Sequence, residues 1–365
     1  MASLRTITIA GGGLAGLTLG IGLRQRGIPV AIWEAGGYPR HRVCGEFISG
    51  NGPAILRRLG LLPLLENAGA IRVNSAAFIS GASRSPVRAL PSPALGLSRH
   101  RLDAALAGEF QRLGGELRLG ARWHPAGARS IAPRETRVNP AEQCSALRQE
   151  GVVRASGRRA QPTENGWRWF GLKAHARNVD LAADLEMHVS AENYVGVNRI
   201  NDGEVNVCGL FRGRPGETRE AGFELLRGKP GSALRERLAS ARFDEKSFCS
   251  VAGLSLRPQR AADEAECRIG DAITMIPPVT GNGMSMAFES AEIAIEPLSR
   301  YSRDEMTWPE ARQAVARACD AAFAQRLAWA RRLQWLMFSP VLRTPLGPWL
   351  LRSESLWQLL FAKTR

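Results

Sequence analysis

A glycine cluster near the start of the chain is the feature that most restricts the possible folds. Gly11, Gly13 and Gly16 follow the β-branched run Thr6 to Ala10 and precede an apolar segment, Leu17 to Leu23. This order predicts a strand, a tight turn and a helix. Gly11 permits the turn, Gly13 leaves the backbone open to a pyrophosphate, and Gly16 lets the helix pack closely on the strand.

The residues around this turn complete a dinucleotide-binding pattern. Leu14 and Ala15 lie at the expected start of the helix, where unpaired amides attract an anion. A second expected strand, Pro29 to Trp33, ends at Glu34, which Ala35 follows. A carboxylate in this place accepts hydrogen bonds from an adenosine ribose. The spacing therefore predicts a dinucleotide site rather than a plain glycine-rich turn.

A second glycine-rich segment lies near the other end of the sequence. Cys267 to Ala272 is typical of a strand that ends in Gly-Asp, and Pro278, Gly281 and Gly283 come shortly after it. We expect a helix over Met284 to Leu298, whose first amides would face a phosphate or an electron-rich ring. An enzyme that binds only NAD does not need this second anchor.

With both segments in place, the chain resembles the FAD-dependent oxidoreductases related to para-hydroxybenzoate hydroxylase and, more closely, to geranylgeranyl reductases. The resemblance covers most of the chain. It implies that Glu34 binds the adenosine ribose and that Asp271 binds the ribityl chain of FAD. It also implies that the helix beginning near Gly283 and Met284 points at the flavin.

The segment Pro39 to Phe47 resembles a signature of the reductases, in which a basic residue and a Cys-Gly-Glu sequence lie beside the isoalloxazine. The matching residues here are Arg42, Cys44, Gly45 and Glu46. The resemblance thus implies that Arg42, Cys44 and Gly45 contact the cofactor.

Cys44 and Glu46 are the candidate catalytic groups. Cys44 would act as a weak acid near the flavin or line the substrate cavity, and the alternative is that it fills space as a small buried side chain. Glu46 would orient a ring edge or relay a proton. The alternative for Glu46 is a structural salt bridge with Arg40 or Arg42.

Ser98 to Asp103 resembles the Arg-x-x-Leu-Asp helix of the family, so Arg99 is expected near the cofactor's phosphates or linker. Two positions depart from the family pattern. Ser156 replaces the aspartate of the middle Asp-Gly motif, which weakens any inference about a nicotinamide cofactor. Of the reductases' aromatic signature only Tyr194 survives, and Gly196 replaces a large ring, so a geranylgeranyl substrate does not carry over.

The middle of the chain predicts an antiparallel sheet. Asn201-Asp202-Gly203 separates two alternating apolar runs, which is a strong hairpin signal. The expected strands are Ala76 to Ile79, Trp167 to His175, Leu185 to Val189, Tyr194 to Ile200 and Glu204 to Leu210. Ala121 to Glu150 is expected to be irregular. Trp167 to Phe170 resembles the aromatic box of flavin-dependent halogenases but lacks its Ile-Pro ending, so we favour an ordinary aromatic strand.

These patterns give an α/β fold class, with a Rossmann-like FAD-binding domain of three-layer ββα form, an antiparallel-sheet substrate domain and a helical C-terminal segment. The expected FAD-binding domain is discontinuous and consists of residues 1–75, 98–160 and 250–300. The substrate domain would comprise 76–97 and 161–249, and the C-terminal segment 301–365. In this last segment, Ala328 to Phe361 is broken by prolines and predicts two short amphipathic helices, which pack on the core, lie on a membrane or border a lipophilic substrate tunnel.

The composition of the chain restricts the classes of partner that it is expected to bind. The formal net charge of +15 favours anionic ligands, but the arginines are scattered and no zinc or RNA-binding pattern accompanies them, so we expect no specific nucleic-acid partner. The six cysteines form no CxxC pair, which fits a reducing cytoplasm, and no metal site is expected. His41, His100, His175 and His188 lack ligand spacing, and we assign them surface or sheet-packing roles.

The sequence therefore predicts an FAD-dependent oxidoreductase, a monooxygenase or dehydrogenase that acts on a lipophilic or aromatic small molecule with NAD(P)H as a transient electron donor. One alternative is a reductase of isoprenoid or polyene double bonds, and another is a flavin-binding protein without turnover. We expect a cytoplasmic protein, and membrane contact through the C-terminal segment is left open.

Overall fold

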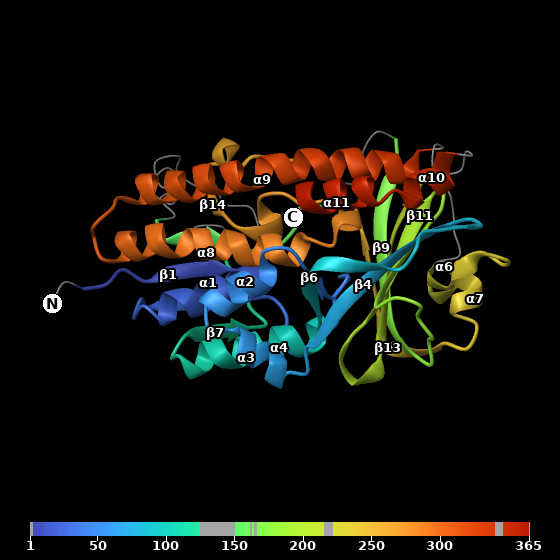
Figure 1. Ribbon diagram of the computed structural model, residues 1–365. Coiled ribbons are helices and arrows are strands. Elements are labelled where there is room, and N and C mark those ends of the chain that lie inside the picture. Colours follow the sequence, from blue (N-terminus) through green and yellow to red (C-terminus); the bar gives the residue numbers. More distant parts are fainter. Residues whose placement is uncertain are drawn as a thin grey trace, which may run out of the picture.

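The described residues form two sheets and a helical C-terminal segment (Figure 1). The computed structural model describes residues 3–124, 150–160, 163, 166–214, 222–339 and 346–364. Most of the segment Ala121 to Glu150, for which we expected irregular structure, lies outside the described residues.

The first sheet is parallel throughout and has the strand order β14-β8-β1-β2-β7. Its strands are β1 (Ile7–Ala10), β2 (Val30–Glu34), β7 (Glu116–Leu119), β8 (Val152–Arg154) and β14 (Cys267–Arg268). Helix α1 (Leu14–Arg24) joins β1 to β2. The strand, turn and helix predicted at the glycine cluster are therefore confirmed.

Helices pack on this sheet through one continuous apolar core. They include α1, α2 (Gly52–Arg58), α3 (Leu62–Asn67), α4 (Arg99–Arg112) and α8 (Gly283–Ser302). The approach of α1 to α8 is close, because a Cβ placed on Gly22 would lie 2.3 Å from Cδ1 of Ile295. The helix expected over Met284 to Leu298 is confirmed as α8.

The second sheet has nine strands, and β10 with β4 is its one parallel pair among the described residues. Its order is β13-β9-β12-β11-β10-β4-β6-β3, and β5 pairs with β4. Asn201–Gly203 forms a short 3₁₀ turn between β11 and β12, which pair antiparallel as the hairpin signal predicted. The strands are β3 (Phe47–Ile48), β4 (Ile71–Ser80), β5 (Ser83–Arg84), β6 (Arg88–Gly96), β9 (Arg168–Arg177), β10 (Leu185–Val189), β11 (Asn193–Arg199), β12 (Val205–Gly213) and β13 (Arg242–Ala252).

The two faces of this sheet differ in what they pack against. The alternation along β9 sends Leu172 and Ala174 into an apolar cluster on one face, which α6 (Phe223–Arg227) and α7 (Ala233–Arg237) help to cover. Lys173 and His175 take the intervening positions and therefore face the other way. That second face, turned toward the parallel sheet and the C-terminal helices, is the one that forms the site described below.

Trp169 lies on the second face, where its ring packs edge-on against Phe338 at 5.1 Å between centroids. Phe170 lies on the opposite face and stacks on Phe211 at 5.4 Å. The aromatic segment Trp167 to Phe170 is thus an ordinary strand with rings packed on both faces of the sheet, as expected.

The C-terminal segment differs from the prediction. Residues up to Phe338 belong to one long helix, α9 (Trp308–Phe338), which starts at a capping box between Thr307 and Glu310. No glycine interrupts it, and Pro309 occupies the first turn, where proline is tolerated. Two short helices, α10 (Leu346–Arg352) and α11 (Glu354–Lys363), follow it. In Figure 1, α9 runs over both sheets, and α10 and α11 lie beside its end.

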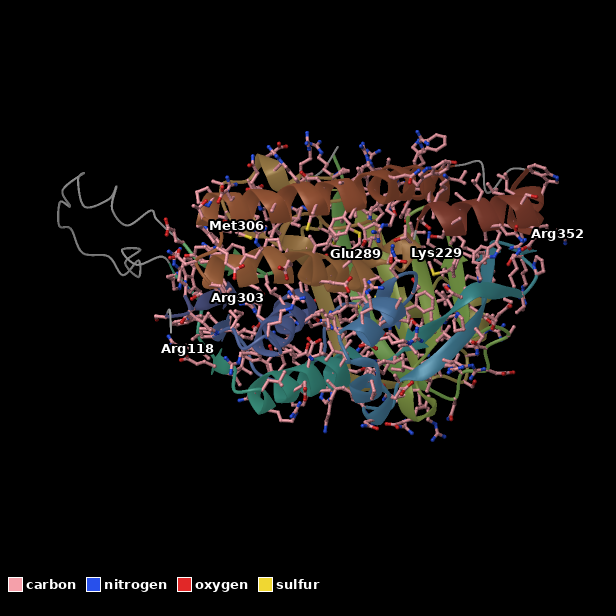
Figure 2. All side chains as sticks on the ribbon, turned by 60° about the vertical axis from the view of Figure 1, so that its left-hand side comes forward. Arg118, Lys229, Glu289, Arg303, Met306 and Arg352 are labelled. Carbon is pink, nitrogen blue, oxygen red and sulfur yellow. The ribbon has the colours of Figure 1, made fainter. Side chains whose placement is uncertain are left out.

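The surface charge is spread rather than concentrated. Figure 2 shows basic side chains over the molecule, with Arg118 and Arg303 toward one end and Arg352 toward the other. Within the described part of the chain, none of the helices combines the length and the apolar character needed to cross a bilayer.

Candidate functional site

A single cavity of about 1000 Å³ connects the two sheets. The N-terminal ends of α1 and α8 both lie on its wall, although they come from opposite ends of the sequence. Of the predicted cofactor-binding residues, all except Gly16 line the cavity: Gly11, Gly13, Leu14, Ala15, Glu34, Ala35, Arg42, Cys44, Gly45, Arg99, Asp271, Pro278, Gly281, Gly283 and Met284. The fold therefore brings the two glycine-rich segments together.

The glycines of the first turn have different physical roles. Gly11 has φ +118°, and a Cβ there would lie 2.3 Å from the carbonyl oxygen of Ala155. A Cβ on Gly16 would lie 2.0 Å from the carbonyl oxygen of Gly11, so this glycine serves helix packing. A Cβ on Gly13, by contrast, would meet no atom within 4 Å and would enter the cavity. The cavity wall at Gly13 is therefore open backbone, which fits a bound pyrophosphate.

Glu34 is buried at the end of β2 and holds the loops around it. One carboxylate oxygen accepts a hydrogen bond from the amide of Gly12 at 2.8 Å, and the other accepts one from Gly36 at 2.9 Å. Arg40 forms an ion pair with it at 2.9 Å. Burial opposes its ionisation, but Arg40 and the two amides outweigh burial and hold its pKa below the usual value. Glu34 is therefore an ionised acceptor beside the glycine turn.

Arg99 and Arg42 meet at Asp103, which is fully buried. Arg99 binds both oxygens of Asp103, with Nε–Oδ1 and Nη2–Oδ2 distances of 2.7 and 2.8 Å. Arg42 approaches Asp103 at 3.4 Å and Glu34 at 3.8 Å. Arg99 is thus fixed by an intrahelical pair on α4 while it lines the cavity, and Arg42 is less tightly held.

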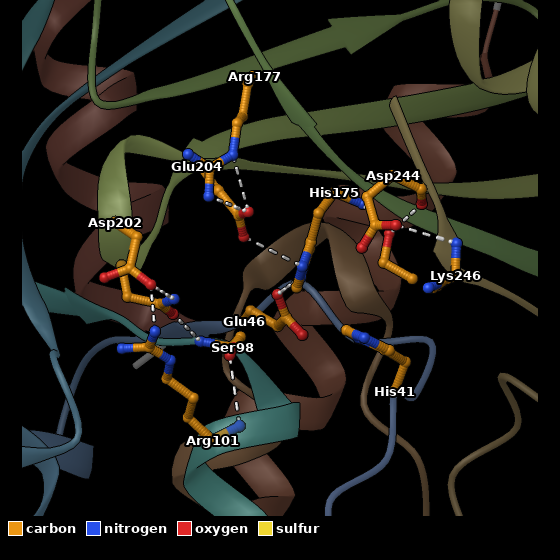
Figure 3. Close-up of polar contacts among 12 residues, drawn as sticks. His41, Glu46, Ser98, Arg101, His175, Arg177, Asp202, Glu204, Asp244 and Lys246 are labelled. Atoms are coloured by element: carbon orange, nitrogen blue, oxygen red, sulfur yellow. Dashed lines mark hydrogen bonds and ion pairs between the residues drawn. The ribbon is translucent and has the colours of Figure 1, made fainter. Parts of the chain in front are cut away.

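Glu46 lies in a buried cluster of charged groups, and Figure 3 shows it beside His175 and His41. Its Oε2 accepts a hydrogen bond from Nε2 of His175 at 2.6 Å. Its Oε1 pairs with Nζ of Lys173 at 3.2 Å and accepts a hydrogen bond from the amide of Arg99 at 2.8 Å. The salt bridge with Arg40 or Arg42, considered from the sequence, is therefore not formed, because those arginines face Glu34 and Asp103 instead.

Both the backbone and the charge of Glu46 are constrained. Its φ of +53° is in the left-handed region, which non-glycine residues seldom adopt and which is enriched at functional sites. Burial by itself would raise the pKa of Glu46, but the hydrogen bond from His175 and the charge of Lys173 lower it overall. Glu46 therefore lines the cavity as a carboxylate in a fixed orientation.

Histidines extend this cluster in two directions. Nζ of Lys173 donates to Nδ1 of His41 at 3.1 Å, and the His41 ring stacks on His100 at 4.6 Å between centroids. Nδ1 of His175 lies 3.6 Å from Oε2 of Glu204, which directly precedes β12. Burial and the neighbouring charges lower the pKa of His41 to about 4, so this ring is neutral at pH 7. The packing or surface roles that the sequence indicates for His41 and His175 do not cover these contacts, in which both rings join a buried charged cluster.

The thiols near this cluster are protonated. Burial raises the pKa of Cys44, and it raises that of Cys249 to about 11. Burial also raises the pKa of Cys208, and all three residues line the cavity. The amide of Glu46 donates to Sγ of Cys44 at 3.5 Å. Cys44 therefore belongs to the cavity wall as a neutral thiol rather than as a thiolate.

The cavity continues into an apolar chamber between the second sheet and the C-terminal helices. Phe78, Leu90, Leu185 and Met187 form its sheet side, and Leu336, Trp357 and Phe361 form its helix side. Among the described residues of this chamber, Arg88 is the single permanently charged one. The chamber is thus shaped for an apolar molecule with one polar end.

Sequence reasoning missed Lys173, His175 and Arg88. A lysine at a central position of an otherwise apolar strand was the available signal for Lys173, because such a residue is rarely buried unless it is paired. The alternation of β9 then places His175 on the same face. Arg88 had no comparable signal, since its ion-pair partner Glu354 and the neighbouring ring of Trp357 come from α11.

No family model and no curated protein matches this chain. Among solved structures, the flavin-dependent brominase Bmp2 matches with a TM-score of 0.73 and 17% identity, over 99% of this chain and 93% of that one. PqsL, a probable FAD-dependent monooxygenase from Pseudomonas aeruginosa, matches with a TM-score of 0.66 and 16% identity, over 92% and 97%. The chain has the fold of these flavoproteins.

A third structure contains the cofactor. A variant of the halogenase PltM in complex with FAD matches with a TM-score of 0.69 and 17% identity, over 98% of this chain and 79% of that one. These similarities confirm the predicted fold class. The closer resemblance to geranylgeranyl reductases stays a prediction, because the structures described above are a brominase, a monooxygenase and a halogenase.

Proposed function

We propose that this protein is an FAD-dependent oxidoreductase that oxidises or hydroxylates a lipophilic or aromatic small molecule, with NAD(P)H as the electron donor. The observation that carries the proposal is the single cavity, which joins two glycine-flanked helix N-termini to an apolar chamber. Similar folds named as FAD-dependent enzymes support it, as does the structure of PqsL with the aromatic ligand 2-aminobenzoylacetate.

The residues that would hold FAD are those on the glycine-rich side of the cavity. Gly13 and the first amides of α1 would bind the pyrophosphate, and Glu34 would accept from the adenosine ribose. Asp271 would bind the ribityl chain, and the start of α8 at Gly283 would face the ring. Bound there, FAD would supply the electron transfer to and from the substrate.

The protein's own contribution to the chemistry would be acid–base control and exclusion of water. Glu46 is the proposed proton-handling group, because it is an ionised carboxylate on the cavity wall. Lys173 and His175 would act as positioning residues that fix its charge and direction. The neutral thiol of Cys44 would line the cavity near the flavin.

A spectrum and an anaerobic titration test the proposal. The purified protein should be yellow, and NADPH or NADH should bleach the flavin absorbance in the absence of oxygen. A colourless protein that ignores added FAD would overturn the proposal. If neither NADPH, NADH nor dithionite gives a reduced flavin that turns over, the alternative of a flavin-binding protein without turnover would be favoured.

A reductase of isoprenoid or polyene double bonds is the second candidate. The sequence Cys44-Gly45-Glu46 and the apolar chamber favour it, whereas Gly196, in place of a large ring, opposes it. Substrate-dependent oxygen consumption with NADPH would identify a monooxygenase. Anaerobic saturation of a polyene with the same donor would identify a reductase.

We also propose peripheral contact with a membrane surface through the end of α9 and through α10. Trp335 and Trp349 are 70% and 68% exposed there, and Arg331, Arg332 and Arg352 flank them. Tryptophan next to basic side chains is typical of segments that lie at the interface of an anionic bilayer.

A further inference from the structure

Arg88, the first residue of β6, is an unusual side chain for the wall of an apolar chamber. It is only 7% exposed, and its neighbours on the wall include Phe78, Leu90 and Trp357. Its guanidinium lies 5.8 Å from the centre of the Trp357 ring. A buried charge of this kind is costly unless polar partners compensate it.

The partners within the chain satisfy only part of this guanidinium. Nε donates to Oε2 of Glu354 at 2.9 Å, but Nη2 is buried without any hydrogen-bond partner. The side chain of Glu354 is itself 59% exposed, so water solvates the carboxylate of that pair. The Arg88 guanidinium therefore retains unused donor capacity inside the chamber.

The position of Arg88 in the sheet sets its distance from the proposed flavin site. Gly96, at the far end of β6, pairs with Phe47, which lies against Gly281 of the second glycine-rich loop. In the register of β4, Gly96 faces Ile71 and Arg88 faces Ala76. These five strand positions correspond to about 17 Å. Arg88 is therefore at the end of the chamber remote from that loop.

We infer that Arg88 binds the carboxylate of an amphiphilic acid whose apolar body lies along the chamber. A guanidinium presents parallel N–H groups that match the two oxygens of a carboxylate. An acid bound in this way supplies the missing acceptor for Nη2, and its apolar body contacts Phe78, Leu90 and Trp357. The inference concerns the substrate class of the proposed enzyme and rests on that function, but the binding itself needs no turnover.

Decanoate and 1-decanol, used as matched probes, test this assignment by titration of the flavin-loaded protein with tryptophan fluorescence as the signal. The unmodified protein should bind decanoate more tightly than 1-decanol. Arg88→Gln should weaken decanoate binding by about tenfold or more, because a hydrogen bond to a charged group is lost, and should leave 1-decanol binding within about twofold.

Glu354→Gln is the control that distinguishes two roles of Arg88. One is recognition of a ligand carboxylate, and the other is a structural clamp, in which the ion pair with Glu354 only holds α11 against the sheet. If Arg88 recognises the carboxylate, this variant should bind decanoate at least as tightly as the unmodified protein, because a competing negative charge is gone. Equal losses for both probes in Arg88→Gln and Glu354→Gln would show a clamp and overturn the inference. Unchanged decanoate binding in Arg88→Gln would also overturn it.

Two further measurements keep the result interpretable. Circular dichroism of each variant establishes that it is folded, and Arg88→Lys, which keeps the charge, should retain more decanoate affinity than Arg88→Gln. Flavin absorbance recorded on the same samples tests the proposed cofactor separately. Protein that carries no flavin but still discriminates decanoate from 1-decanol would refute the proposed function and leave the Arg88 assignment intact.

Discussion

The two ends of the cavity are built by different means. At the glycine-rich end the wall is made of open backbone and helix N-termini, with ion pairs such as that of Glu34 with Arg40 beside it. At the apolar end the wall is made of side chains from one sheet face and three helices, and one arginine is incompletely paired. Backbone geometry thus suits a ligand of fixed shape, whereas the side-chain wall can be altered residue by residue.

Gly13→Val tests the glycine-rich end of the cavity and should have the largest effect of the proposed variants. A Cβ at this position meets no protein atom within 4 Å, so the variant should fold, but its branched side chain fills the place proposed for the pyrophosphate and should abolish FAD retention. The flavin-to-protein absorbance ratio after gel filtration measures this. Gly108→Val, at an exposed position of α4 with open space around its Cβ, is the matched control and should keep its flavin. Stoichiometric FAD in Gly13→Val would contradict the assignment.

Lys173→Met tests the charge cluster where the two ends meet. Removing one partner of a fully buried pair leaves the Glu46 carboxylate undercompensated, so the free energy of unfolding should fall by about 3 kcal/mol. Urea denaturation measures the change. Glu46→Gln combined with Lys173→Met should recover part of the loss. If the double variant is as unstable as the sum of both single ones, the two residues are not coupled.

The pH dependence of stability should depend on His41. Its pKa of about 4 in the folded protein is below the value of about 6.5 for an unfolded chain, so the unfolded state binds protons first. The resulting stability is present above pH 6.5 and is lost as the pH falls toward 4. Glu46 acts in the same direction: because its pKa is lowered in the folded protein, the unfolded chain binds its proton first as the pH falls below about 4.5, and more stability is lost.

His41→Gln should therefore show a shallower loss of stability between pH 6.5 and pH 4 than the unmodified protein. Urea denaturation at several pH values in this interval gives the slopes. The effect should be smaller than that of Lys173→Met, because His41 is partly exposed. Parallel slopes for the two proteins would refute the role given to His41.

Replacing Trp335 and Trp349 with serine should have the smallest effect on the fold. Both side chains are exposed, so stability should change by less than about 0.5 kcal/mol per site, whereas sedimentation with anionic vesicles should decrease. Val87→Ser, at a position that is 52% exposed, is the control. If vesicle binding is unchanged after the tryptophan replacements, the proposed membrane-contact surface is wrong.

The sequence predicted the glycine-rich end of the cavity far better than the parts of its wall that are made of side chains. Gly11, Gly13 and Glu34 act within one strand–turn–helix–strand unit, so their spacing alone indicates their geometry. Glu46 meets Lys173 and His175 only through the loop that follows β2 and the pairing of β9 with β12 and β13. A single sequence carries no record of such long-range pairings.

The helices that cover the apolar chamber were also only partly predictable from local sequence patterns. Prolines indicated where the last helices separate, but the continuous α9 up to Phe338 was not predicted, because its apolar positions serve two different cores. Its first part packs on the parallel sheet, and its end packs against the second sheet. The surroundings of Arg88 depend on that arrangement and so were not visible from its neighbours in sequence.

The chain order of the strands has a consequence for protein engineering. β1, β2, β7, β8 and β14 of the parallel sheet alternate along the chain with the strands of the second sheet. No single cut can therefore separate the two sheets into intact fragments. Exchanging the stretches that contain β4 to β6 and β9 to β13 as paired inserts would instead transplant a new ligand wall onto an unchanged parallel scaffold.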